Sequence, residues 1–205
     1  MKNIFKGLIV IAVALMVTAC RGNDDALRET ENWGVEELKQ LIQDTYDNFD
    51  TGFMSETMEI TDPEMITHRT GLRNVSQIEH MVTSNALMMT TPYTFMLLKV
   101  EDGANIDQLK QEIIDNIDLW WWICVSADVA YVTSFGHIIM IVMAEEDVAD
   151  GVYNAFGQAV NGTLGTRLTK ENDGTPGGGD LFPDIDLDLD PDFDFENDDE
   201  GIFVE

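Results

Sequence analysis

Three strand-like segments in the second half of the chain constrain its fold more than any other feature. Residues 93–100 form a continuous, mostly apolar run of β-forming side chains that ends at a turn over Glu101–Gly103. Residues 129–134 and 137–143 have the same character, and only Phe135–Gly136 separates them. We therefore expect a core strand followed later in the chain by a tight β-hairpin.

Two amphipathic helices alternate with these strands. Asn105 and Gln108 form a capping pair ahead of an apolar stripe, and three acidic residues at 145–147 open a last helix. The order strand, helix, strand, strand, helix predicts an α+β fold, a two-layer sandwich with helices mainly on one face of an antiparallel or mixed sheet. A crossover between parallel strands would be right-handed. We expect the core to include Leu97, Ile113 and Ile141.

The first half of the domain predicts three further elements and one ambiguous segment. Apolar residues at three-to-four spacing predict a helix over residues 35–49, and residues 54–60 suit a short strand. Asp62–Pro63 is a typical helix start and Gly71 a typical stop, so we expect a helix over residues 63–70. Residues 74–91 fit either a helix or a strand, and we favour a strand.

The order and texture of these elements resemble one known family. The resemblance rests on residues 95–102, 122–125 and 129–132, with the helix that ends at Ile117 and the strand that ends at Met143. It covers roughly residues 50–160 and points to uncharacterised small lipoproteins of Gram-positive bacteria, known only as a domain of unknown function. The resemblance therefore implies no activity and no site residues.

The N-terminus has the three regions of a secretory signal. Lys2 and Lys6 are followed by an apolar run over residues 8–17 and by Val-Thr-Ala-Cys, which ends at Cys20 and resembles a bacterial lipobox. The run is shorter than the ~20 residues that a spanning helix needs. We expect a signal peptide at residues 1–19, lipidation of Cys20 and anchoring on the outer face of the cell membrane. The alternatives are an ordinary signal peptide and an uncleaved anchor.

Composition divides the rest of the chain into three parts. Residues 20–32 are polar and predict a tether, and residues 33–165 carry the periodic patterns of a single domain. Residues 166–205 predict a linker and an acidic disordered tail, with Thr175–Gly179 as the flexible part. This glycine run lacks the Gly-Lys-Ser/Thr ending of a phosphate-binding loop.

The charge of the chain excludes two classes of partner. The formal net charge is −28, and residues 171–205 contain 14 acidic residues and no basic one. Nucleic-acid binding needs Lys and Arg to neutralise phosphates, and anionic lipid headgroups would also be repelled. We therefore expect neither as a direct partner.

The tail alternates acidic and apolar residues from 184 to 196, with Pro191 as an interruption. Three interpretations remain open: a solvated disordered tail, a weak Ca²⁺ site, and a motif that adds as a strand to a partner's sheet. An EF-hand loop is excluded because Pro191 and Asn197 occupy its glycine and glutamate positions. The candidate Ca²⁺ ligands are Asp184, Asp186, Asp188, Asp190, Asp192 and Asp194.

Trp120, Trp121 and Trp122 form the second unusual feature. Three adjacent indoles cannot all point inward, so we expect at least one to be exposed and available to a protein, a glycan or the membrane interface. The alternative is structural: Trp120 and Trp122 close the end of the sheet while Trp121 covers the preceding helix.

Catalytic signals are weak. Cys124 lies in an apolar run, which predicts a small buried hydrophobe, and it has no disulfide partner if Cys20 is lipidated. His68, His80 and His137 lack metal-ligand spacing, and no nucleophile elbow occurs. The sequence therefore predicts a lipid-anchored, non-enzymatic domain that binds another envelope component, most simply a protein. A Ca²⁺- or small-ligand-binding module is the alternative, and an envelope enzyme is the third possibility.

Overall fold

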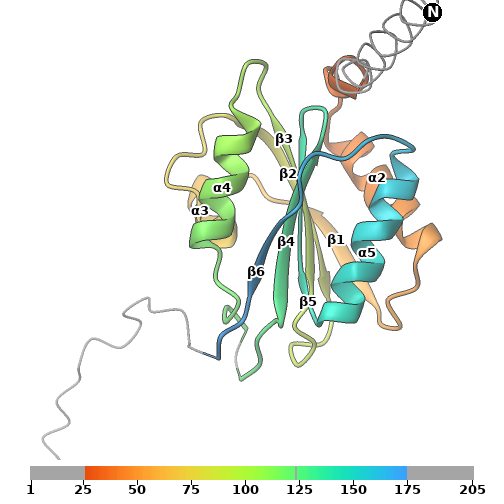
Figure 1. Cartoon of the computed structure of the whole chain (residues 1–205), viewed down its shortest axis with the longest axis vertical. Helices are drawn as coiled ribbons and strands as arrows, with labels where there is room; N and C mark the ends of the chain where they lie inside the picture. The colour runs from red at the N-terminus through yellow and green to blue at the C-terminus, as the bar shows by residue number, and fades with distance from the viewer. Residues whose placement is uncertain (1–25, 123, 175–205) are drawn as a thin grey trace, which may run out of the picture.

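The computed structural model describes residues 26–122 and 124–174, which form an α+β fold around a six-stranded sheet (Figure 1). Every pair of neighbouring strands is antiparallel, and the order across the sheet is β1-β2-β3-β5-β4-β6. The predicted α+β class is therefore confirmed, and the sheet, predicted as antiparallel or mixed, is antiparallel. The strands are β1 (Ser55–Glu59), β2 (Ile78–Ala86), β3 (Thr94–Val100), β4 (Val129–Phe135), β5 (Ile138–Ala144) and β6 (Leu168–Glu171).

Helices cover both faces of the sheet, where the sequence predicted them mainly on one. In Figure 1, α2 (Val35–Asn48) and α5 (Glu146–Ala159) lie on one side, and α3 (Pro63–Thr70) and α4 (Ile106–Asn116) lie on the other. The physical reason is the composition of the central strands: every residue of β3, β4 and β5 is buried. A strand that is apolar on both faces needs cover on both. The molecule therefore has three layers.

Two separate cores result, one on each face. Leu97 lies in the core under α2 and α5, while Ile113 and Ile141 lie in the core under α3 and α4. All three side chains are 0% exposed, so their predicted burial is confirmed.

The path from β3 through α4 to β4 is a split crossover. Both β3 and β4 are antiparallel to β5, which lies between them, so β3 and β4 run parallel without pairing. The β4–β5 hairpin, predicted at Phe135–Gly136, turns between Phe135 and Ile138.

The strand β6 was not predicted. It lies within residues 166–205, which the sequence assigned to the linker and tail, and it pairs with β4 at the edge of the sheet. Asn172 continues this contact, because its backbone N donates to Asp128 O over 2.8 Å. Four residues of alternating exposure give too weak a pattern to distinguish a strand from a linker. The domain therefore extends at least to Asn172.

Residues 26–30 form a helical turn, here called the N-terminal turn, inside the segment predicted as a tether. It packs on the β4–β5 hairpin, where a Cβ on Gly136 (φ +54°) would clash with Thr30 and Ala26. Both Thr30 and Ala26 are buried. Glycine at this hairpin thus permits both the left-handed backbone and the close approach of the N-terminal turn.

The predicted local signals account for the helix starts. Asp62 accepts a hydrogen bond from Glu64 N, and Asn105 accepts one from Gln108 N. The helix α3 ends at Gly71, whose φ of 74° is left-handed, as predicted from its position. The ambiguous residues 74–91 contain β2, so the preference for a strand is confirmed.

Candidate functional site

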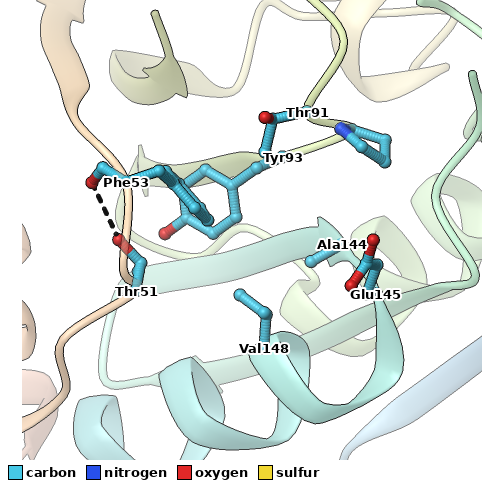
Figure 2. Close-up of a pocket in the computed structure, with 8 residues that line it drawn as sticks. Thr51, Phe53, Thr91, Tyr93, Ala144, Glu145 and Val148 are labelled. Atoms are coloured by element: carbon cyan, nitrogen blue, oxygen red, sulfur yellow. Dashed lines mark hydrogen bonds between the residues drawn. The ribbon is translucent and has the colours of Figure 1, made fainter. Parts of the chain in front are cut away.

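A first pocket of about 240 Å³ opens at the end of the sheet beside α5 (Figure 2). Phe53 and Tyr93 form its aromatic wall, with their rings in edge-to-face contact at 4.8 Å between centroids. Thr51 donates its hydroxyl to Phe53 O over 3.2 Å and so fixes the loop before β1. Glu145 adds a carboxylate, and the described lining residues include no cation. The pocket is therefore apolar with an acidic side.

The hydroxyl groups near this pocket do not favour catalysis. Tyr46 hydroxyl lies 2.9 Å from Tyr93 hydroxyl and 2.8 Å from Ser84 Oγ, which links α2 to the sheet. Burial, with a smaller contribution from Tyr46, raises the pKa of Tyr93 well above its ordinary value. A phenol whose ionised form is disfavoured in this way is a poor general base. These hydroxyls have a structural role.

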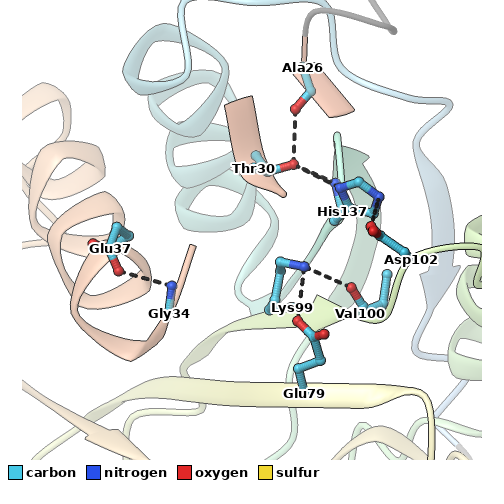
Figure 3. A network of polar contacts seen from close by, with 9 residues as sticks. All are labelled: Ala26, Thr30, Gly34, Glu37, Glu79, Lys99, Val100, Asp102 and His137. Atoms are coloured by element: carbon cyan, nitrogen blue, oxygen red, sulfur yellow. Dashed lines mark hydrogen bonds and ion pairs between the residues drawn. The ribbon is translucent and has the colours of Figure 1, made fainter. Parts of the chain in front are cut away.

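A polar network lies at the opposite end of the sheet, near the N-terminal turn (Figure 3). Lys99 is 1% exposed, and its ammonium donates to Glu79 Oε2 over 2.9 Å and to Val100 O over 3.0 Å. His137 Nε2 lies 3.0 Å from Asp102 Oδ1, while its backbone N donates to Thr30 Oγ1 over 2.8 Å. The His137 ring and backbone N–H thus both have polar partners among the described residues.

Thr30 is the centre of the contact between the N-terminal turn and the hairpin. We expect Thr30→Val to reduce the free energy of unfolding by about 1–3 kcal/mol, because it leaves the buried backbone N–H of His137 without its acceptor and removes the hydroxyl bond to Ala26 O. Chemical denaturation and amide hydrogen exchange at His137 measure the loss. Thr45→Val is the matched control, because the buried Thr45 hydroxyl bonds only to Leu41 O within its own helix. Equal effects of the two substitutions would contradict this role.

A second pocket, here called the distal pocket, has a volume of about 260 Å³. It lies where the β2–β3 loop meets the loop between α4 and β4, at the end of the sheet opposite the N-terminal turn. Seven residues line it: Arg69, Asn85, Ala86, Met88, Met89, Trp121 and Trp122. It thus combines residues from α3, β2 and two loops.

The tryptophans build the floor of this site. The Arg69 guanidinium carbon lies 4.5 Å from the centroid of the Trp121 ring, and Trp121 and Trp122 are in edge-to-face contact at 5.1 Å. Trp120 instead donates its indole N–H to Asn172 Oδ1 over 3.2 Å and so fixes the end of β6. All three indoles are partly exposed and pack against the core under α3 and α4.

The distal pocket is rich in donors and has no acid in its lining. Burial lowers the pKa of the Arg69 guanidinium, which forms no ion pair with any residue that the structure describes. Its one hydrogen bond, from Nη1 to Asn85 Oδ1, is long at 3.4 Å. Arg69 Nε and Trp121 Nε1 are buried without an acceptor among the same residues. In a chain with 39 acidic and 11 basic residues, a partly buried guanidinium without a carboxylate partner among the described residues is unusual.

Sequence reasoning found the tryptophans but missed the rest of this site. Arg69, Asn85, Met88 and Met89 carry no motif, and only the fold brings α3 and the β2–β3 loop beside Trp121. Cys124 is a correction: it is exposed with φ of 69°, where the apolar run predicted burial. The run lies in a loop rather than a strand, so its apolar residues do not all enter a core.

Other predicted sites lie outside the described residues. These are Cys20 and the tail aspartates from Asp184 to Asp194. Among the residues that are described, no group of three or more His, Cys, Asp or Glu is placed to hold a metal ion. Over the same ranges, no helix is long and apolar enough to span a membrane.

Comparison with known proteins gives no relative. Neither a family model, nor a curated protein, nor a solved structure matches this chain. The resemblance to the lipoprotein family therefore stays a prediction.

Proposed function

We propose that this chain is a lipid-anchored extracytoplasmic domain that binds another protein of the cell envelope without catalysis. The observation that carries the proposal is the exposure of apolar side chains at the distal pocket: Leu87 is 53% exposed, and Met88 and Met89 are 65% exposed each. They lie beside Trp121 and Trp122, which are themselves partly exposed. Gathered methionines and aromatics are typical of protein-binding surfaces.

Further exposed apolar side chains belong to the same region. Within the described residues, the other large exposed ones are Met54, Met58 and Met65. Met54 O accepts a hydrogen bond from Leu87 N, Met58 lies on β1 beside β2, and Met65 is one helical turn before Arg69 in α3. Clustering of exposed apolar groups in one region marks an interaction site more strongly than scattered ones do.

The position of this region favours a protein partner over the anchoring bilayer. If Cys20 carries the lipid, five residues separate it from the N-terminal turn, a span of at most roughly 20 Å at ~3.5 Å per residue. The N-terminal turn lies at one end of the sheet, and the β2–β3 loop, which carries Met88 and Met89 of the distal pocket, lies at the other (Figure 1). Central strands of seven residues, at about 3.3 Å each, separate the two ends by roughly 20 Å. Met88 and Met89 thus lie at the end of the sheet away from the N-terminal turn.

In-cell photo-crosslinking tests the proposal. A photoreactive residue at position 89 should give a defined protein adduct, while the same group at Asn154, an exposed position on α5, should not. Adding Met88→Ser to the position-89 variant should weaken partner binding, and so reduce the adduct, about tenfold or more. This is the effect of truncating an interface residue that contributes ~2 kcal/mol to the free energy of binding. Identical adducts from positions 89 and 154, or adducts with lipid alone, would contradict the proposal.

A further inference from the structure

We propose that the distal pocket binds a carboxylate that adjoins an apolar side chain, presented by an exposed segment of the partner protein. This inference rests on the proposed function and adds the chemistry of recognition. The lining combines N–H donors with apolar side chains, and its seven residues include no Asp or Glu. The complementary ligand therefore carries acceptors with negative charge next to an apolar group.

Arg69 provides the positive charge. Its guanidinium is partly buried, it stacks on Trp121, and it forms no ion pair within residues 26–122 and 124–174. Stacking holds the planar group in place, and its Nε has no acceptor among the described residues. A carboxylate is the acceptor whose geometry matches the edge of a guanidinium, and the charge-assisted bonds are the strong ones. Binding would offset the desolvation that Arg69 already bears.

Asn85 provides a second, oriented donor. Its Oδ1 accepts hydrogen bonds from Thr94 Oγ1 over 2.8 Å and from Thr83 Oγ1 over 3.3 Å. With Arg69 Nη1 at 3.4 Å, these hydroxyls assign Oδ1 as the acceptor of the amide, and Nδ2 donates to none of the described residues. Because Asn85 lines the pocket beside Arg69, a bound oxygen would meet donors from both residues.

The apolar wall and the volume set the size of the ligand. Met88 and Met89 are flexible and polarizable, so they can adapt to an apolar side chain next to the carboxylate. A pocket of about 260 Å³ is smaller than the ~300–1,000 Å³ typical of sites for drug-sized ligands and cofactors. It suits one side chain and one carboxylate of a peptide segment rather than a large cofactor.

A matched pair of probes tests the inference on the full chain. N-Acetyl-leucine and N-acetyl-leucinamide differ in the carboxylate alone, and NMR of the Trp121 indole and of the Met88 and Met89 methyl groups reports their binding. We expect the acid to bind at least tenfold more tightly than the amide. Arg69→Gln should abolish this preference, and Arg69→Lys should retain only part of it because the forked geometry is lost. Arg73→Gln removes one charge at an exposed position four residues further along the chain, outside the lining of the pocket, and should change nothing.

Four results would overturn the inference. One is equal binding of the acid and the amide to the unaltered chain, which needs no variant to fold. Another is an unchanged preference in folded Arg69→Gln. The third is a large gain in probe affinity on replacing Asp192 and Asp194 by Asn, since the chain's own tail would then be the occupant. The fourth is a protein adduct from position 89 that Arg69→Gln leaves intact. This result would agree with the proposed partner binding and contradict the recognition of a carboxylate by Arg69.

Discussion

Leu97→Ala is expected to reduce the free energy of unfolding by about 2–5 kcal/mol, the usual range for removing a buried leucine side chain. Leu97 is 0% exposed in the middle of β3, opposite Val82 of β2 and Met140 of β5. Its side chain belongs to the core under α2 and α5. Strands pair on both sides of it and helices lie above it, so the surroundings have little freedom to fill the cavity.

Urea denaturation measures this loss, and the chain offers a matched control. Leu87→Ala removes the same atoms from a side chain that is 53% exposed, so it should change stability by about 0.5 kcal/mol or less. A loss well under 1 kcal/mol for Leu97→Ala would contradict the position of β3 in the sheet. The two variants also distinguish a role in the core from a role in partner binding, because only Leu87→Ala should weaken the position-89 adduct.

The sequence predicted the fold's elements better than their layering. Strand and helix signals along residues 35–160 are local, which is why Asp62, Asn105 and Gly71 marked element ends correctly. The number of layers depends on whether one or both faces of the sheet are buried. Residues 94–100 indicate burial of both faces only when the side chains of both faces are considered, since every position of the strand is buried. The strand β6 depends on its pairing with β4 and has little signal of its own.

The distal pocket illustrates a different limit. The three adjacent indoles pointed to part of the site, because no single strand or turn buries them all, and two of them, Trp121 and Trp122, line the pocket. Arg69 looks like an ordinary residue in the last turn of a helix, where a cation is favourable. Its lack of a carboxylate partner among the described residues depends on three-dimensional packing. The acidic composition of the chain would instead have suggested that Arg69 forms an ion pair. The function of such a residue emerges only when its neighbours are known.

Cys20→Ala is expected to remove the protein from the membrane fraction or to leave an unprocessed precursor. The lipobox cysteine is the attachment point in this proposal, and two or more acyl chains give stable anchoring where one gives only marginal binding. None of the helices in the described residues is long and apolar enough to span a bilayer. Fractionation with an immunoblot for precursor and mature forms measures the change.

Cys124→Ala is the control for this experiment, because it removes the other thiol of the chain at an exposed loop position. It should leave both processing and membrane attachment unchanged. A Cys20→Ala protein that is still processed and still sediments with membranes would contradict lipidation.

The position-89 adduct adds a second measurement. With the anchor lost, the domain is no longer held at the same surface as its partner, so the amount of adduct should fall even though the distal pocket is intact. An adduct that persists at full strength would mean that the partner binds the domain independently of the membrane.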